Sequence, residues 1–299
     1  MQKNPLMGRQ LSALKDIEGD SVPPGLPEIV DAHVHVFPGP IFKAVWAWFE
    51  EYGWPIRYQL RSEDLVRHLL SRGISHVVAL QYAHKPGIAR DLNRYMARLR
   101  EHFSGKVTGM ATVFPGEPDS EAILKEAFEM GLSGVKLHTH VQCFDMNSRE
   151  LNEVCATCAR EGKPMVVHAG REPKSPAYKC DPYLLCSAEK LENILKDFPD
   201  LKMCVPHLGM DEIVAYSHLI EKYDTLWLDT TMAIADFLPL DVVVRLEEMR
   251  TDRVMYGTDF PNIPYAWDRE LKKLLRYPLS EKALAGILGE NAKAFFGIS

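Results

Sequence analysis

Long uninterrupted hydrophobic runs are missing from this sequence of 299 residues. No run of about 18 apolar residues is present, so we predict no membrane-spanning helix. The first 25 residues also lack the apolar stretch of a signal peptide, and Ser-Val-Pro-Pro-Gly at 21–25 resembles a loose lead-in. We therefore expect a cytoplasmic protein that has no membrane partner.

Basic residues are also fewer than acidic residues in this sequence. The chain has 35 Lys and Arg against 41 Asp and Glu, which gives a formal net charge of −6. No basic run breaks this pattern, so the electrostatic signature of a nucleic-acid-binding protein is absent. We expect a small-molecule substrate instead, and a homodimer is the base-rate expectation for the assembly.

Cysteine is too sparse for a disulfide framework, since six cysteines are spread over a long chain. Cys155 and Cys158 have C-x-x-C spacing, but they fall inside a predicted amphipathic helix, 149–161, and no second pair follows at zinc-ribbon spacing. Helix packing is therefore the favoured interpretation of this pair. No Gly-x-Gly-x-x-Gly follows the first predicted strand, so nothing indicates a dinucleotide site.

Short apolar strands alternate with amphipathic helices along the chain, which is typical of a parallel sheet covered by helices. The predicted strands are 29–36, 75–81, 107–114, 134–138, 164–168, 201–207, 225–229 and 254–259. The predicted helices are 62–72, 88–102, 119–130, 148–161, 188–198, 211–222 and 239–249, with more from 265 and 280 onward. Eight such units predict a (β/α)₈ TIM barrel, with a doubly wound open sheet as the alternative.

The predicted barrel forms one domain over 28–299, preceded by an N-terminal extension over 1–27. An aromatic insertion, 41–58, follows the first strand and has the spacing of a short helix. Two interpretations stay open for it: packing against the barrel, or a lid over the site.

The first strand carries His33 and His35 just before a Pro-Gly-Pro stop. Side chains alternate in a strand, so both histidines face one way while Val34 and Val36 face the other. Two imidazoles on one face can bind one metal ion, although two ordinary histidines in a strand are the alternative.

Later strands end in ionisable residues in the same manner. In a barrel the carboxyl ends of all strands meet on one face, where active sites lie. The residues that reach this face are Lys136, His138, His168, His207 and Asp259.

Five ordered motifs together resemble the amidohydrolase superfamily, and most of all its amidohydrolase-related branch, which includes aminocarboxymuconate-semialdehyde decarboxylase and pyrone-dicarboxylate lactonase. The motifs are Asp31-Ala-His33-Val-His35, Gly134-Val-Lys-Leu-His138, Val167-His168-Ala-Gly170, Pro206-His207-Leu-Gly209 and Gly257-Thr-Asp259-Phe-Pro261. The resemblance covers about 28–296 and leaves the substrate open.

The resemblance implies roles for four of these side chains as metal ligands. By similarity, His33, His35, His168 and Asp259 bind one divalent metal ion, with zinc favoured and manganese or iron also compatible. His207 would hydrogen-bond the activated water or the substrate. Asp259 would also accept the proton of the attacking water.

Lys136 and His138 admit two interpretations. In binuclear members of the superfamily the lysine of the fourth strand is carboxylated and bridges two metals. Because the branch usually holds one metal, we expect an unmodified Lys136 that helps to bind substrate and a His138 that contacts substrate or a ligand. His140 is expected in a loop and not as a ligand.

The resemblance favours metal-dependent hydrolysis of a small, carboxylate-bearing ester, lactone or amide. Non-oxidative decarboxylation of an aromatic or semialdehyde acid is the alternative, a metal-free lactonase is a variant, and an inactive binding protein is the rival from another class. Arg171, three residues after His168, would hold a substrate carboxylate in a bidentate grip. A loop-stabilising arginine is the competing interpretation.

Overall fold

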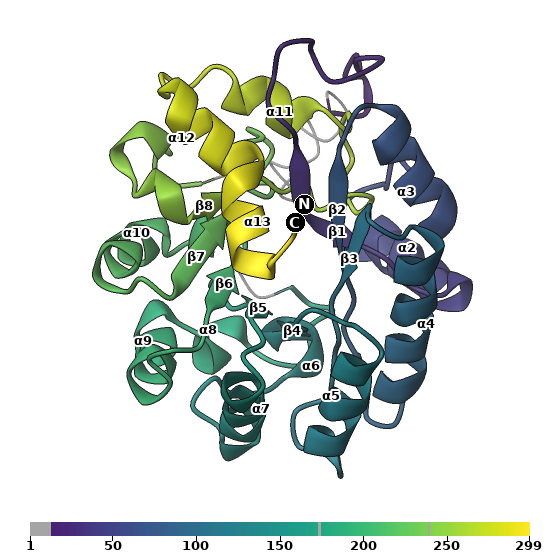
Figure 1. Ribbon diagram of the computed structural model, residues 1–299, viewed down its shortest axis with the longest axis vertical. Coiled ribbons are helices and arrows are strands. Elements are labelled where there is room, and N and C mark those ends of the chain that lie inside the picture. The colour runs from purple at the N-terminus through teal and green to yellow at the C-terminus, as the bar shows by residue number, and fades with distance from the viewer. Residues whose placement is uncertain (1–12, 173–174, 239) are drawn as a thin grey trace.

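The computed structural model describes residues 13–172, 175–238 and 240–299. It forms a TIM barrel, with eight parallel strands inside a ring of helices (Figure 1). The strands are β1 Val30–His35, β2 His76–Leu80, β3 Val107–Gly109, β4 Val135–His138, β5 Met165–His168, β6 Met203–Val205, β7 Leu226–Asp229 and β8 Val254–Met255. Each one falls within a predicted strand, so the barrel prediction is confirmed.

The barrel is built from two hydrogen-bonded sheets, β1–β2–β3 and β4–β5–β6–β7–β8. Isolated bridges join them on both sides, Ala111 with Val135 and Val34 with Phe260. Backbone hydrogen bonds from Asp259 to the His33 carbonyl and from His35 to the Phe260 carbonyl reinforce the second seam, at 3.0 and 2.8 Å. The first strand and the residues after the last one therefore lie side by side.

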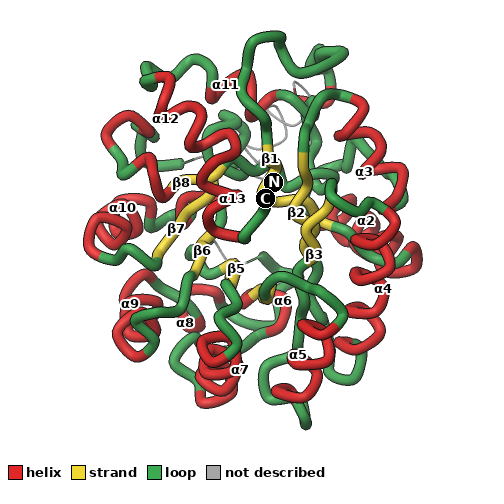
Figure 2. The backbone as a smooth tube through the Cα atoms, in the orientation of Figure 1, coloured by secondary structure: helices red, strands yellow, loops and turns green. Residues whose placement is uncertain are grey.

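Helices surround the strands (Figure 2), and the longer ones pack apolar side chains into the core around the barrel. They are α2 Gly39–Tyr52, α3 Ser62–Ser71, α4 Ala89–His102, α5 Ser120–Glu129, α6 Thr139–Gln142, α7 Arg149–Arg160, α8 Pro182–Leu185, α9 Ala188–Asp197, α10 Ile213–Lys222, α11 Arg269–Leu274, α12 Glu281–Ala285 and α13 Asn291–Phe296. Ser148 and Ser187 begin α7 and α9 by accepting a backbone N–H with their hydroxyls, which satisfies a free donor of the first turn.

The barrel interior has two layers. The lower layer is apolar and is closed by Phe295 and Phe296 of α13, which lies across the centre of the barrel in Figure 1. The upper layer carries the ionisable side chains. A β-bulge between Asp31 and Val34 adds one residue to β1 relative to β2. Val30 and Ala32 therefore belong to the lower layer, while His33 and His35 are buried above it.

One predicted helix is wrong. Over 241–249 the chain forms loop and a single 3₁₀ turn, Leu246–Glu248, and Val243 is 84% exposed. The β-branched run Val242-Val243-Val244 has a low helix propensity. Because Val242 and Val243 are exposed, tertiary packing does not compensate for that low propensity. Residue 239 lies outside the described part.

The described part of the N-terminal extension contacts the barrel. The Gly19 carbonyl accepts from Trp267 Nε1 at 3.0 Å, and the Asp16 carbonyl accepts from Arg57 at 2.9 Å. Residues 1–12 lie outside the described residues, so the domain boundary at 27/28 stays a prediction. Among the described helices, none has the length and apolar character to cross a membrane.

Candidate metal centre

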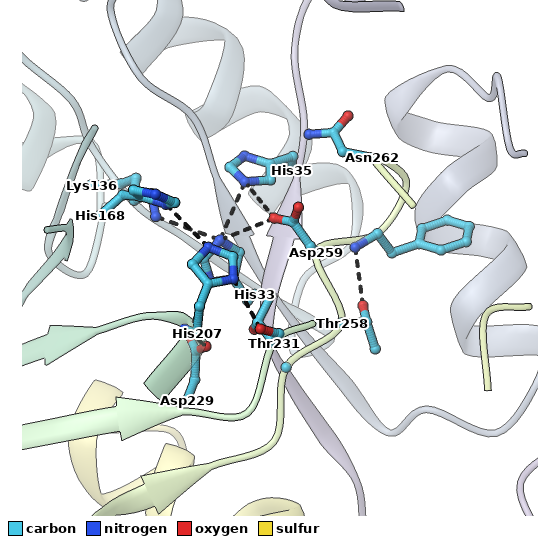
Figure 3. Close-up of polar contacts among 12 residues, drawn as sticks. His33, His35, Lys136, His168, His207, Asp229, Thr231, Thr258, Asp259 and Asn262 are labelled. Atoms are coloured by element: carbon cyan, nitrogen blue, oxygen red, sulfur yellow. Dashed lines mark hydrogen bonds and ion pairs between the residues drawn. The ribbon is translucent and has the colours of Figure 1, made fainter. Parts of the chain in front are cut away.

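Three of the four predicted metal ligands converge at the carboxyl end of the barrel. The Nε2 atoms of His33 and His35 lie 3.2 Å apart. Asp259 Oδ1 lies 3.4 Å from His33 Nε2 and 3.0 Å from His35 Nε2. Figure 3 shows these side chains directed toward one another.

The spacing of these three donor atoms fits a divalent cation. Zinc–nitrogen and zinc–oxygen bonds of about 2.0–2.1 Å in a tetrahedral site place the ligand atoms about 3.3 Å from one another. The observed separations of 3.0–3.4 Å match this value. Burial lowers the pKa of both histidines, to about 3 for His33, which leaves their nitrogen lone pairs free for a metal.

Asp259 is held in place by the seam between the first and last strands. Its backbone has a positive φ of 64°, which takes the chain out of the strand ladder after β8. Asp31 stabilises this turn, because it accepts hydrogen bonds from the Thr258 hydroxyl at 2.6 Å and from the Thr258 N–H at 3.2 Å. The two motifs that carry the ligands are thus bonded to each other.

Asp229, at the end of β7, orients His33 from behind. Its Oδ2 lies 2.9 Å from His33 Nδ1, and its Oδ1 accepts the backbone N–H of His207 at 3.0 Å. Burial acts to raise the pKa of Asp229, but the charge and hydrogen bond of His33 bring it well below its usual range. An ionised Asp229 fixes the tautomer in which His33 Nε2 faces the centre.

His168 and His207 form a second pair beside this group. His168 Nδ1 lies 3.1 Å from His207 Nε2, and His207 Nδ1 donates to the Thr231 carbonyl at 2.9 Å. The ring of His207 is 5.5 Å from that of His33. Figure 3 shows His207 between His168 and His33. The predicted fourth ligand therefore contacts His207 directly.

Lys136 is placed beneath the site. Its side chain is fully buried and its Nζ lies 3.5 Å from His33 Nε2. Burial lowers its pKa to about 8. Lys136 does not line the cavity above the histidines, so the structure does not support the expected direct contact with substrate.

A cavity of about 290 Å³ opens above the histidines. His35, His138, His168, His207 and Asp259 form its floor. Its walls are largely aromatic: Trp48, Phe49, Tyr52, Trp54, Tyr82 and Tyr178. The aromatic insertion thus forms helix α2 and a wall of the cavity, and Trp54 is fixed by a 2.8 Å hydrogen bond from Nε1 to the Asn262 carbonyl. No lysine or arginine is present among the described lining residues.

His138 lines the cavity as expected, and it stacks on His168 with ring centres 4.1 Å apart and planes 13° apart. Together with His140 these rings form a second group of closely spaced possible metal ligands. Nearly parallel rings direct their lone pairs side by side, so they do not converge on one ion. His138 is better placed to position His168 and to contact substrate.

His140 is buried in the one-turn helix α6 and not in the expected loop. Its Nδ1 lies 2.7 Å from Glu172 Oε1, which also accepts from the Tyr178 hydroxyl at 2.8 Å. The second oxygen of Glu172 is 4.0 Å from His168 Nε2. Glu172 therefore links a predicted ligand to an aromatic wall of the cavity.

Arg171 faces away from the cavity. Its Nε donates to the Cys186 carbonyl at 3.0 Å, and its Nη1 lies 3.8 Å from Glu212. Its guanidinium also lies over the Tyr183 ring at 5.4 Å. The expected bidentate grip on a substrate carboxylate is not supported, because these contacts already hold the guanidinium in the loop.

Sequence reasoning missed Asp229, Glu172 and Asp31 as site residues. Asp229 ends its strand just as the chosen residues do, so strand position was a usable signal. Asp31 stands beside the His-x-His pair, but only the seam with Thr258 gives it a role. No pattern in the sequence marked Glu172, because its contacts depend on how the loop after β5 folds back toward α6.

Comparison with known proteins agrees with the resemblance that the five sequence motifs indicated. Residues 30–298 match the family model described as amidohydrolase. No curated protein matches the chain.

The solved structures that share the fold include the following three. An uncharacterised TIM-barrel protein from Bordetella bronchiseptica is 19% identical, with a TM-score of 0.67 over 90% of this chain and 98% of its own. The 5-carboxyvanillate decarboxylase of Novosphingobium aromaticivorans, complexed with manganese and 4-hydroxy-3-methoxy-5-nitrobenzoic acid, is 15% identical, with a TM-score of 0.64 over 94% and 99%. A probable 2-pyrone-4,6-dicarboxylic acid hydrolase from Acinetobacter baumannii, with citric acid bound, is 15% identical, with a TM-score of 0.60 over 90% and 99%.

The family match covers nearly the whole barrel, from the first residue of β1 to the end of α13. It contains every strand end that contributes to the site. The chain is an enzyme of the amidohydrolase family.

Proposed function

We propose that this enzyme is a metal-dependent hydrolase of a small ester, lactone or amide. The observation that carries the proposal is the group of His33, His35 and Asp259, whose donor atoms lie 3.0–3.4 Å apart under a cavity. We assign these three residues, with His168, as ligands of one divalent ion, zinc in preference to manganese or iron. These residues would hold the ion, whose chemistry when bound would be polarisation of a carbonyl group and supply of hydroxide near neutral pH.

The protein's own groups would perform the remaining steps. Asp259 accepts a proton from the attacking water on a carboxylate oxygen. His207, whose Nδ1–H is committed to the Thr231 carbonyl, lines the cavity and would hydrogen-bond the activated water or the substrate there. The aromatic walls exclude bulk water and hold a flat substrate.

The lining also bears on substrate charge. Glu172, Asp211 and Asp259 line the cavity, while no lysine or arginine does so among the described residues. This supports a substrate that is neutral or carries a single carboxylate, of which the second agrees with the carboxylate-bearing substrate expected from the sequence, and it counts against polycarboxylates.

The test is to purify the protein, measure zinc, manganese and iron per chain, and assay small aryl esters, lactones and anilides. His35→Ala, which removes one predicted ligand, is the matched variant. We expect hydrolysis that is lost with a chelator, restored by one metal and absent in the variant. Hydrolysis that survives in metal-free protein would favour the metal-independent lactonase variant.

Decarboxylation of an aromatic acid is the second candidate, and the aromatic walls favour it. The structural likeness to 5-carboxyvanillate decarboxylase supports the same idea. Release of carbon dioxide from hydroxybenzoate-type acids, with no hydrolysis of any ester, would select this candidate. A homodimer and a cytoplasmic location stay predictions, for which light scattering and cell fractionation are the tests.

A further inference from the structure

Two cysteine thiols from different loops meet at one backbone oxygen. Cys143 Sγ lies 3.5 Å from the His140 carbonyl oxygen, and Cys180 Sγ lies 3.3 Å from the same atom. Cys143 ends helix α6, and Cys180 lies in the loop between β5 and α8. The shared oxygen therefore brings the two sulfur atoms close together from different parts of the chain.

These two are the cysteines that solvent can reach. Cys143 is exposed and Cys180 partly exposed, whereas Cys155, Cys158, Cys186 and Cys204 are buried. Burial and then a hydrogen bond with Cys143 raise the pKa of Cys180 to about 12. An exposed thiol placed beside a second thiol at one carbonyl oxygen has the arrangement that thiol–disulfide exchange requires.

We propose that Cys143 and Cys180 form a reversible disulfide, with a low-molecular-weight disulfide as the oxidant. The Cys143 thiolate attacks one sulfur of the oxidant, which forms a mixed disulfide and releases one thiolate. Cys180 then attacks the Cys143 sulfur, which forms the protein disulfide and releases the second thiolate. Two protein thiols are oxidised, the oxidant is reduced to two thiols, and these two thiols take up both protons.

The Cys143–Cys180 disulfide would restrain the loop that carries Tyr178, a residue of the cavity wall. Tyr178, two residues before Cys180, lines the cavity, donates to Glu172 at 2.8 Å and stacks on Trp48 with ring centres 5.7 Å apart. The reduced protein holds this loop by such weak contacts, whereas the disulfide would tie it covalently to α6. We therefore assign Cys143 and Cys180 as a redox-controlled latch on the aromatic wall.

The test uses the full-length protein equilibrated with mixtures of reduced and oxidised glutathione. We expect the folded wild type to lose two hydrogen atoms in intact mass, with a peptide link between Cys143 and Cys180, and to regain them with a dithiol reductant. Cys143→Ser and Cys180→Ser should each abolish the link. Cys186→Ser is the matched control, because Cys186 Sγ lies 3.5 Å from the His140 ring, and this variant should keep the link.

A second readout follows the loop. Lys179 is exposed, so brief trypsin treatment of folded protein should cut after it, and cleavage depends on how often the loop opens. We expect oxidation to slow this cut by on the order of tenfold in wild type and Cys186→Ser, and to leave it unchanged in Cys143→Ser. Separate glutathione adducts without a cross-link, a link to another cysteine, or an unchanged cleavage rate after cross-linking would each overturn the latch.

Discussion

His33 Nδ1 and Asp229 Oδ2 lie 2.9 Å apart, and both side chains are fully buried. The same carboxylate accepts the backbone N–H of His207 through its other oxygen. One aspartate thus orients a predicted ligand from β1 and positions His207, two residues after the end of β6. Carboxylates placed in this way raise the basicity of the ligand and hold its ring in the coordinating direction.

Asp229→Asn should therefore weaken metal binding. Loss of such a partner costs about 10–100-fold in metal affinity. Competition with a coloured chelator gives the dissociation constant, and circular dichroism checks the fold. Asp91→Asn, on the exposed surface of α4, is the control that should leave the affinity unchanged. Equal affinity in wild type and Asp229→Asn would remove Asp229 from the metal centre.

His207→Asn tests whether one metal or two are present. With one metal, activity should fall by about 10²–10⁴ because acid–base help is lost, while metal content stays near one per chain. The measurement is metal per chain in wild type, His207→Asn and Lys136→Ala, prepared with bicarbonate and excess metal. A wild-type content near two that drops in both variants would instead indicate a carboxylated Lys136 bridging two ions.

Arg171→Lys should affect stability and not substrate binding. The lysine keeps the charge but loses the hydrogen bond to the Cys186 carbonyl, so unfolding should become easier by about 0.5–1.5 kcal/mol. Urea unfolding measures this change, with the exposed Arg149→Lys as the control. KM for any substrate found should match that of wild type. A raised KM with unchanged stability would restore Arg171 to the role predicted from the sequence.

Glu270→Gln should flatten the dependence of stability on pH. Burial raises the pKa of Glu270 well above its ordinary value, with smaller contributions from the charges of Asp229 and Asp31. Between the ordinary pKa and the raised one, the folded state holds a proton that the unfolded state has released. Stability therefore falls as pH rises through that window, by up to about 1.4 kcal/mol per pH unit.

The measurement is urea unfolding of Glu270→Gln and wild type at several pH values between 5 and 8. The difference between the two proteins isolates Glu270 from other titrating groups. We expect the variant to gain relative to wild type as pH rises. Glu290→Gln, which is exposed, should track wild type. A difference that does not vary with pH would contradict the buried, protonated state of Glu270.

The barrel was predictable because its strands are short apolar runs that end in polar residues, and each observed strand falls inside a predicted one. The same rule identified His33, His35 and Asp259, since parallel strands bring their ends together whatever the loops do. The helix predicted over 239–249 failed because Val242 and Val243 are apolar but exposed to solvent. An apolar pattern predicts a helix only when a partner covers its face.

Contacts made by loops that fold back onto the barrel could not be predicted from the sequence. Arg171 was placed near the site by its distance in sequence from His168, but its side chain turns toward Cys186 and Glu212. Glu172, its neighbour, reaches His140 and Tyr178 instead. The distance in sequence from His168 does not determine where either side chain points, because the loop conformation depends on contacts with residues far along the chain.

The extra residue in β1 determines which of the later side chains in this strand point into the barrel. Side chains alternate with a period of two, so one inserted residue exchanges the inward and outward sets for everything that follows it. Without the bulge, Ala32 and Val34 would point inward and the two histidines would face the helices. Regular alternation over the same residues would therefore hide His33 and His35 from the cavity, whereas deletion of Ala32 would remove the extra residue and leave both histidines facing inward.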